Sequence, residues 1–369
     1  MRPEVLRKVN QHIKMGRPYL NPLHPCQIFQ EGDILEIGFL SKRCVYDAKG
    51  TCIMCDYGCA KGTYSDEEYI NEMTQILTQY SEGITVLLLC ANGSILNPNQ
   101  FSDELIEKIL LQAAQIEIPQ IEIECHYKDV TVKKLEMIKK CLPNKQVTIE
   151  MGLETINPVY QELFFGKEID MNEYEDILLL IRNYGFQIDL NIILGLPFLS
   201  PIDQLQDTRQ TLDWVFAHQC SPIIFPVNIK PFTLLMHMYQ SGNYKPISHW
   251  LMLSLLDSIE EEKLNQVVVA WYGNREEVYE AADSRTIFPT VCSNCAEAMK
   301  DFYDKFASYH NSNVRKKLLQ DMLSTPICSC REQLKFVKGT ANDFENQCEK
   351  YINQLLDEYA FLFQENNEL

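Results

Sequence analysis

Short apolar runs alternate with amphipathic stretches over residues 31 to 229. The apolar runs have the length of buried strands, and the stretches between them repeat apolar residues at helical spacing. This alternation is the sequence signature of parallel βα units. The runs that predict strands are Ile34–Phe39, Ile84–Ala91, Ile121–Cys125, Gln146–Met151, Phe186–Leu194 and Pro222–Asn228.

The segments between these runs carry helix start signals. Ser65 and Glu68 form a capping-box pattern, and Ser102 precedes an acidic first turn. Ser200 precedes Pro201, which suits the first position of a helix. Six βα units are too few for a complete eight-stranded barrel. The sequence therefore predicts an α/β fold with a partial (βα)6 TIM-type barrel, whose functional loops lie at the carboxyl ends of the strands.

From about residue 236 the pattern changes to mostly helical segments. They cover Trp250–Glu261, Ala296–Tyr309, Val314–Leu323 and the residues from Ala341 onward. We therefore expect three parts: a basic N-terminal extension (1–30), the partial barrel (31–235) and a helical, cysteine-containing C-terminal domain (236–369).

Composition narrows the class of protein. No apolar run approaches the ~20 residues that cross a bilayer, and the basic first segment lacks the apolar core of a secretory signal. Fourteen cysteines without an export signal predict a cytoplasmic, reducing location in which clustered thiols bind metal. The net charge of -18 weighs against nucleic acid, although a local patch such as the basic N-terminal segment could still bind it.

Four cysteines lie in one short loop directly after the first predicted strand: Cys44, Cys52, Cys55 and Cys59. Three converging thiolates would hold a four-iron four-sulfur (4Fe-4S) cluster and leave one iron open to a further ligand. A four-thiolate zinc site is the alternative. Zinc knuckles usually lie on hairpin turns, so the position after the first strand of a βα series favours the cluster.

A second set of cysteines has the pairs Cys292-x2-Cys295 and Cys328-x-Cys330. Each pair precedes a predicted helix, and a helix N-terminus favours the thiolate form that binds metal. Two close pairs in a reducing compartment predict one shared metal site. Zinc is the favoured occupant on general grounds, an auxiliary iron–sulfur cluster is the alternative, and four thiols without a metal are the third possibility.

Polar residues and a glycine follow several predicted strands, where they would surround the barrel mouth. Glycine lets the backbone approach a ligand closely, and carboxylates could hold a sulfonium, an amine or ribose hydroxyls. An ordinary turn would explain the same residues without a ligand. The candidates are Asn92, Gly93, Ser94, Glu124, Glu154 and Asn228, with His126 as a weaker one on the rim.

The loop KRCVYDAKGTCIMCDYG is followed, in order, by ANGSILNP, GLET, LGLPF and PVNIKPFTLLMHMYQSGNYKPISHW. Together these motifs resemble the radical S-adenosyl-L-methionine (SAM) superfamily, in the branch that contains the radical SAM subunit of archaeosine synthase and is related to Elp3-like enzymes. The resemblance covers most of residues 31 to 255. Residues 287–291 lack the Arg-Gly-Pro lead of that branch before the second cysteine set, so the substrate stays open.

The resemblance implies roles for individual residues. Cys44, Cys52 and Cys55 would bind three irons of the cluster, SAM would chelate the fourth, and Cys59 would be a bystander. Met54 would lie near the adenine. The segments that would contact SAM contain Asn92, Gly93, Ser94, Glu124, Glu154, Gly195, Pro197 and Asn228.

The implied activity is reductive cleavage of SAM and abstraction of a hydrogen from the substrate by the resulting radical, in a lyase or transferase reaction. An archaeosine-like enzyme would break a C–N bond in a lysine adduct of a 7-deazaguanine base in tRNA, with ferredoxin or flavodoxin as electron donor. One alternative is radical chemistry on a small molecule or peptide. The other is a non-catalytic, metal-stabilised module that binds tRNA or another partner.

Overall fold

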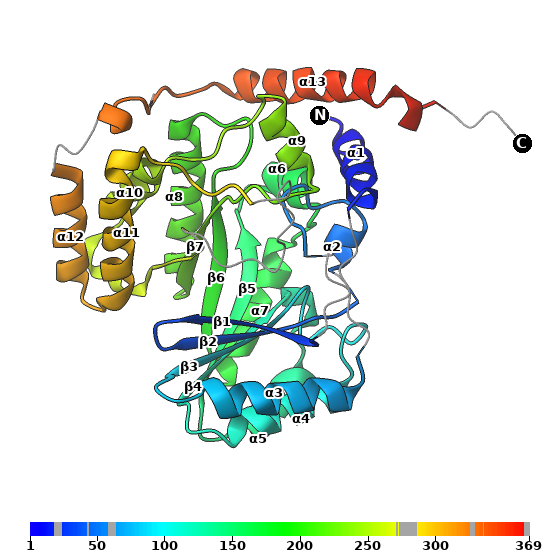
Figure 1. The fold of residues 1–369 in the computed structure, drawn as a ribbon, viewed down its shortest axis with the longest axis vertical. Coiled ribbons are helices and arrows are strands. Elements are labelled where there is room, and N and C mark those ends of the chain that lie inside the picture. Colours follow the sequence, from blue (N-terminus) through cyan, green and yellow to red (C-terminus); the bar gives the residue numbers. More distant parts are fainter. Residues whose placement is uncertain are drawn as a thin grey trace, which may run out of the picture.

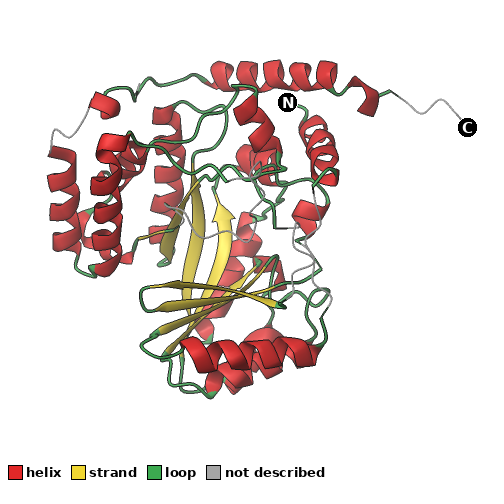
Figure 2. Cartoon of the chain, in the orientation of Figure 1, coloured by secondary structure: helices red, strands yellow, loops and turns green. Residues whose placement is uncertain are grey.

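The computed structural model describes residues 1–17, 24–42, 44–57, 64–270, 272, 286–324, 329–334 and 336–364. Within them, a curved eight-stranded sheet forms the centre of the molecule (Figures 1 and 2). The strands follow the chain order: β1 (Cys26–Glu31), β2 (Ile34–Phe39), β3 (Val86–Ala91), β4 (Gln120–Cys125), β5 (Gln146–Glu154), β6 (Gln187–Leu194), β7 (Ser221–Pro226) and β8 (Val268–Val269). This sheet confirms the predicted partial barrel.

The helices between the parallel strands cover the outside of the sheet. They are α3 (Asp66–Tyr80), α4 (Asp103–Ala114), α5 (Val132–Cys141), α7 (Met171–Asn183) and α8 (Pro201–Ala217). Their predicted start signals are confirmed: Ser65 forms the capping box with Glu68, and Ser102 and Ser200 accept hydrogen bonds from the first helical turns. Alternate strand residues such as Ile37 supply the apolar layer beneath these helices.

Two strands and one helix carry no clear signal in the sequence. Strand β1 pairs antiparallel with β2 through a turn at Gly32, whose φ is 59°. Strand β8 has only two residues and pairs with β7, so it is too short to show a period. Helix α1 (Pro3–Met15) lies in the segment expected only to be a basic extension.

The C-terminal helices form two groups. In Figure 1, α10 (His249–Asp257), α11 (Ser293–Ser308) and α12 (Ser312–Ser324) lie beside α8, and residues such as Phe302 and Leu319 join the barrel core. Helix α13 (Ala341–Glu358) crosses the end of the molecule where α1 and α9 (Leu234–Gln240) lie. The domain boundaries expected from the sequence stay a prediction, because the C-terminal helices share a continuous core with the barrel.

The remaining helical segments are short: α2 (Val45–Ala48), α6 (Pro158–Tyr160), η1 (Tyr127–Asp129), η2 (Gln161–Phe165), η3 (Glu261–Gln266), η4 (Ser329–Arg331) and η5 (Ala360–Leu362). None of the helices in the described ranges is both long and apolar enough to span a membrane.

Candidate functional site

A cavity of about 1360 Å³ occupies the barrel interior and reaches the carboxyl ends of the strands. Cys44, Cys52 and Cys55 all line it. Glu124 and Glu154, which come from the ends of two neighbouring strands, line the same cavity. The structure therefore places the first cysteine set and the two carboxylates predicted at the barrel mouth around the same cavity.

The cysteine loop is packed tightly against the rest of the chain. Cys44 precedes α2, and Gly50 follows that helix with a φ of 68°. A Cβ on Gly50 would lie 2.8 Å from the Cβ of Gln11, so glycine is needed for α1 to pack this closely. Further along the loop, the carbonyl of Ile53 accepts a hydrogen bond from the N–H of Leu235 at 3.1 Å.

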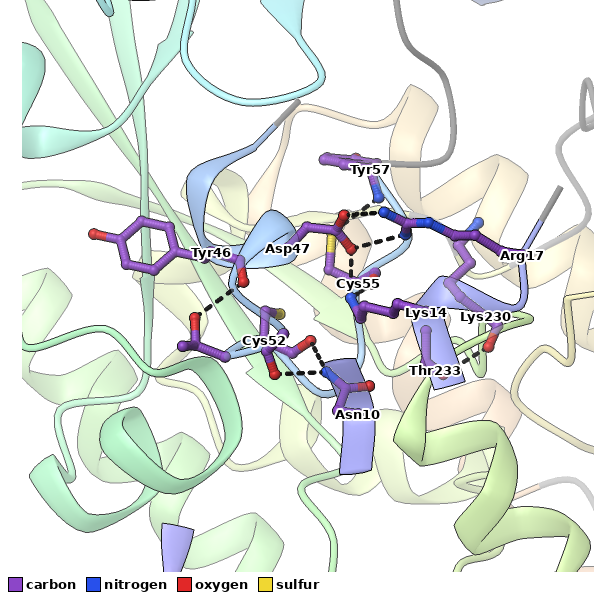
Figure 3. A network of polar contacts seen from close by, with 12 residues as sticks. Asn10, Lys14, Arg17, Tyr46, Asp47, Cys52, Cys55, Tyr57, Lys230 and Thr233 are labelled. Atoms are coloured by element: carbon purple, nitrogen blue, oxygen red, sulfur yellow. Dashed lines mark hydrogen bonds and ion pairs between the residues drawn. The ribbon is translucent and has the colours of Figure 1, made fainter. Parts of the chain in front are cut away.

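Asn10 joins α1 to the cysteine loop from its buried position (Figure 3). Its Nδ2 donates to the carbonyls of Gly50 at 2.8 Å and Cys52 at 2.9 Å. Its Oδ1 accepts from the N–H of Leu234 at 2.9 Å. One amide side chain thus satisfies backbone groups of the loop and of the start of α9.

Lys14 and Arg17 form a buried ionic network with Asp47 (Figure 3). The Lys14 ammonium contacts Asp47 and also donates to the carbonyl of Cys55 at 2.6 Å. The Arg17 guanidinium donates to both Asp47 oxygens, at 2.6 and 3.1 Å. Burial opposes ionisation of Asp47, but the hydrogen bonds and positive charges of Arg17 and Lys14 hold its pKa below the ordinary value.

The thiols of the loop are electrostatically unequal. The hydrogen bond from Cys55 lowers the pKa of Cys52 to about 7, against the effect of burial, and the positive charge of Lys14 acts in the same direction. Burial raises the pKa of Cys44. Among the described residues, these three do not form a group whose sulfur atoms all lie within 4.8 Å of one another. Cys52 and Cys55 lie within hydrogen-bonding distance of each other, but the three sulfur atoms do not converge as the ligands of one ion would. Three thiolates in one loop beside a cavity are a donor set that suits a cluster.

Glu154 has an unusual backbone at the end of β5, with a φ of 67° next to a shift in strand register. Its carboxylate forms a partly buried ion pair with Lys167 at 2.6 Å. A Cβ on Gly152 would lie 2.6 Å from the Glu154 Oε1 and 3.1 Å from the Lys167 Nζ. Glycine at 152 therefore makes room for the pair, which lies beside the cysteines.

Asn92 holds two loops together at the barrel mouth. Its Oδ1 accepts from the N–H of Ser41 at 2.7 Å, and its Nδ2 donates to the carbonyl of Tyr57 at 3.1 Å. Gly93 lines the cavity, and a Cβ on it would lie 2.2 Å from the Gln100 side chain. A larger residue at this position would therefore displace the end of the Gln100 side chain.

Ser94 and His126 lie side by side on the cavity wall. The Ser94 hydroxyl accepts from the N–H of His126 at 3.0 Å. Burial lowers the pKa of His126 to about 3, so the ring is neutral at pH 7. Because its Nδ1 accepts from the N–H of Lys128, its Nε2 carries the proton and donates to the Tyr46 hydroxyl at 3.0 Å.

The other predicted SAM contacts are divided between the cavity and its supporting structure. Glu124 and Asn228 line the cavity. Gly195 has a φ of 119°, and its carbonyl accepts from the Tyr244 hydroxyl at 2.7 Å. Gly195 and the buried Pro197 do not line the described cavity. A SAM-binding role stays a prediction for all four residues.

Three cysteines of the second set converge at another place in the molecule. The Sγ atoms of Cys292 and Cys295 are 3.5 Å apart, and those of Cys295 and Cys330 are 3.6 Å apart. All three lie within 4.8 Å of one another. The indole N–H of Trp250 donates to the Cys330 sulfur at 3.1 Å. Cys328, the fourth predicted ligand, lies outside the described residues, as does Cys59 of the first loop.

Sequence reasoning missed several residues of the site. Lys14 and Asp47 meet only because α1 packs on the cysteine loop, and their spacing of 33 positions gives no local signal. Lys167 likewise reaches Glu154 from a segment without a motif. The acidic residues inside the barrel did leave a signal, because they alternate with apolar residues in segments such as IEIEC, residues 121 to 125.

Comparison with known proteins identifies two sequence relatives of this chain. No model of a protein family matches the chain. Archaeosine synthase subunit beta of Methanosarcina acetivorans is 21% identical over 307 residues, which are 82% of this chain and 84% of the relative. The same subunit of Thermococcus kodakarensis is 21% identical over 210 residues, which are 56% of this chain and 65% of that relative.

A solved structure of Elp3 from Methanocaldococcus infernus is 14% identical, with a TM-score of 0.45, and the match covers 66% of this chain and 59% of Elp3. The two sequence relatives confirm the resemblance to the archaeosine synthase subunit that the ordered motifs predicted.

Proposed function

We propose that this chain is a radical SAM enzyme in which Cys44, Cys52 and Cys55 bind a 4Fe-4S cluster and the cavity binds SAM. The observation that supports this most directly is that the three thiols, from a loop after the first parallel strand, line the cavity at the carboxyl ends of the strands. When bound, the cluster supplies an electron that cleaves SAM to methionine and a 5'-deoxyadenosyl radical able to abstract hydrogen.

The chain's own residues would bind and orient SAM. Gly93 and Ser94 present the loop after β3 to the cavity, and Asn92 holds that loop to the segment containing the cysteines. Glu154, which pairs with Lys167, offers a carboxylate for an amine or ribose hydroxyls. Gly195 and Pro197 would support the adenine side, and Asn228 would be a further polar contact from the cavity lining.

Apolar and basic residues would protect and hold the cluster. Met54 and Phe165 are buried and line the cavity beside the thiols, where they limit the access of water and oxygen. Lys14 supplies a buried positive charge that favours the thiolate form of Cys52. Its second contact, to the carbonyl of Cys55, fixes the backbone of the third ligand.

The named relatives favour an archaeosine-like reaction, in which the radical leads to cleavage of a C–N bond in a lysine adduct of a tRNA base. Such an enzyme would require an electron donor such as ferredoxin or flavodoxin. Whether the overall reaction is of the lyase or the transferase type depends on the fate of the cleaved fragment.

Radical chemistry on a small molecule or peptide is the second candidate, and the N-terminal segment favours it. Lys14 and Arg17 are buried against Asp47, so they are not part of a surface that could bind RNA. Arg2 forms an ion pair with Glu349 at 2.7 Å. The basic extension is thus largely engaged within the protein, whose net charge is -18.

We also propose that the second cysteine set binds one zinc ion. Four thiolates at the usual Zn–S distance of about 2.3 Å in a tetrahedron have sulfur atoms roughly 3.8 Å apart. The separations of 3.5 and 3.6 Å among Cys292, Cys295 and Cys330 are close to this value. Cys328 would complete the site. An auxiliary iron–sulfur cluster would require the sulfur atoms to move apart.

The test is anaerobic reconstitution of the full chain with iron and sulfide, followed by incubation with SAM and dithionite. We expect brown cluster absorption and formation of 5'-deoxyadenosine. Stimulation by tRNA that carries the modified base supports the archaeosine-like reaction, whereas stimulation only by a small-metabolite fraction supports the second candidate. A protein that binds zinc in both cysteine sets and never cleaves SAM would instead be a non-catalytic binding module.

A further inference from the structure

Tyr46 is a side chain of the cysteine loop to which the cysteine motif gives no role. It follows Cys44 by two positions and lines the cavity. Figure 3 shows its ring pointing away from the Asp47 network, so its hydroxyl takes no part in the contacts that hold the loop to α1. Burial raises the pKa of Tyr46, which keeps this hydroxyl protonated at pH 7. The cavity wall beside the first cysteine therefore contains a phenol that can donate a hydrogen bond.

The His126 ring, at the end of β4, holds the Tyr46 side chain in place. Its Nε2 lies 3.0 Å from the Tyr46 hydroxyl oxygen. The centres of the two rings are 5.3 Å apart, and their planes form an angle of 33°. His126 also contacts the buried ring of Tyr127, with the ring centres 5.0 Å apart. These aromatic contacts and the hydrogen bond fix the orientation of the Tyr46 hydroxyl.

The direction of this hydrogen bond leaves the proton of the Tyr46 hydroxyl unused. The Nδ1 of the neutral His126 ring accepts from the N–H of Lys128 at 3.3 Å, so the protonated Nε2 donates to the Tyr46 oxygen. Within the described part of the chain, the Tyr46 hydroxyl has no hydrogen-bond partner besides this ring. A hydroxyl at a cavity wall that accepts one hydrogen bond and donates none offers its proton to a molecule inside the cavity.

We propose that the Tyr46 hydroxyl donates a hydrogen bond to the carboxylate of SAM, and that His126 is the positioning residue that directs this donor. A carboxylate has acceptors only, so it matches a hydroxyl that has only its proton to offer. The Lys167 ammonium lies 5.9 Å from the centre of the Tyr46 ring and adds a positive charge on the same side. This inference rests on the proposed function, because it assumes that the cavity binds SAM.

A purely structural role for Tyr46 leads to different expectations. If its contact with His126 only tied the cysteine loop to the end of β4, loss of the hydroxyl would lower the Tm and the iron content of the protein. It would also weaken the binding of every ligand of the cavity to a similar degree. The proposed hydrogen bond affects only ligands that have the carboxylate.

The test is equilibrium dialysis of the reconstituted full chain, without reductant, against SAM and separately against 5'-methylthioadenosine. The second probe keeps the adenine and ribose of SAM and lacks its carboxylate. Tyr46→Phe should weaken SAM binding by about tenfold and leave the affinity for 5'-methylthioadenosine within about twofold of the wild type. Its iron content and Tm should stay close to those of the wild type. Tyr309→Phe, which removes an exposed hydroxyl at the end of α11, is the matched control and should keep both affinities.

Variants of His126 test its positioning role. His126→Leu should weaken SAM binding by about threefold or more, because the Tyr46 hydroxyl is then free to turn. His126→Gln keeps an N–H donor near the position of Nε2 and should restore part of this affinity. The double variant Tyr46→Phe/His126→Leu should bind SAM as tightly as Tyr46→Phe alone, because His126 acts through the hydroxyl that is already missing.

Three results would overturn the inference: wild-type affinity for SAM in Tyr46→Phe, an equal loss of affinity for SAM and 5'-methylthioadenosine, or additive losses in the double variant. A failure of the proposed function has a different signature. In that case the cluster-loaded wild type itself does not bind SAM, and both the function and this inference are wrong.

Discussion

The two cysteine sites differ in how their thiols are spaced and held. Among the residues that the structure describes, only Cys292, Cys295 and Cys330 bring three sulfur atoms within 4.8 Å of one another. The first set lines a cavity and is held from outside by the polar network of α1. Similar residue types thus form a compact site suited to one ion and an open site suited to a larger cofactor with a vacant position.

The surroundings that hold the two cysteine sets in place also differ, and this indicates that the two sites have different roles. The compact site is held by apolar packing, since Cys295 is fully buried among Phe302 and Met299 of α11. The open site is held by buried charges and amide groups, which fix the backbone without filling the space in front of the thiols. A structural metal needs only its ligands, whereas a reactive cofactor must leave room for a substrate.

The largest expected effect comes from removing one cysteine from each site. Cys52→Ala should abolish the brown cluster absorption and lower 5'-deoxyadenosine formation to background, because the cluster loses one of three ligands. Cys295→Ala should keep the cluster and lose about one equivalent of zinc, with a loss of stability on the order of several kcal/mol. Metal analysis, absorption spectra and Tm together check both results.

Cys141→Ala is the matched control, because this buried cysteine lies on α5, away from both sets. It should keep both metals. If Cys52→Ala kept the full cluster signal, the ligand assignment would be wrong. If Cys295→Ala lost the cluster and kept zinc, the two sites would have to be exchanged.

The second prediction concerns the network that holds the open site. Asp47→Asn leaves Lys14 and Arg17 buried without their counter-ion. Removal of one partner from a buried ion pair typically costs about 3–5 kcal/mol of unfolding free energy. We also expect weaker retention of iron, because Lys14 positions the backbone of Cys55. Zinc in the compact site should be unaffected.

Asp66→Asn is the control for this change. Asp66 pairs with Lys108 at 3.3 Å on the surface, and exposed pairs contribute about 0–1 kcal/mol. Chemical denaturation and iron retention measured during dialysis would compare the two variants. A loss in Asp47→Asn no larger than in Asp66→Asn would show that the α1 network does not hold the loop.

The fold was much easier to predict from the sequence than these supports. Short apolar runs and capping residues such as Ser65 and Ser102 revealed six parallel strands and their helices, because these signals are local. The cysteine motif likewise pointed to the cavity. The contacts of Lys14 with Asp47 and of Lys167 with Glu154 depend on how distant segments pack, so no local pattern predicts them.

The third prediction uses the pH dependence of the same network. The pKa of Asp47 in the folded protein lies below its ordinary value of about 3.9. Its contribution to stability is therefore complete above the unfolded pKa and is lost as pH falls through the folded pKa. The difference in Tm between the wild type and Asp47→Asn should be constant from pH 7 to about 5 and narrow below about pH 4.

Comparison with Asp47→Asn isolates the effect of this residue from that of buried carboxyl groups inside the barrel, whose protonation affects stability in the opposite direction. Glu122 has a pKa raised by burial, so its protonation at lower pH stabilises the folded protein. Differential scanning fluorimetry over the pH series measures the Tm of the wild type and of Asp47→Asn under the same conditions. A Tm difference that widens as pH falls would contradict a depressed pKa for Asp47.

The smallest expected effect concerns the compact site and its one polar support. Trp250→Phe removes the indole N–H that donates to the Cys330 sulfur at 3.1 Å, while it keeps an aromatic ring in a buried position. A hydrogen bond to a metal-bound thiolate withdraws electron density from the sulfur, so its loss should shift the thiolate-to-metal absorption of the cobalt-substituted protein to lower energy. The loss of stability should be about 1–2 kcal/mol, since a smaller ring also packs less completely.

Trp214→Phe, on α8 and away from these cysteines, should lower stability by a similar amount without a change in the cobalt spectrum. An unchanged spectrum in Trp250→Phe would mean that Cys330 is not a ligand, and the compact site would then contain at most Cys292, Cys295 and Cys328.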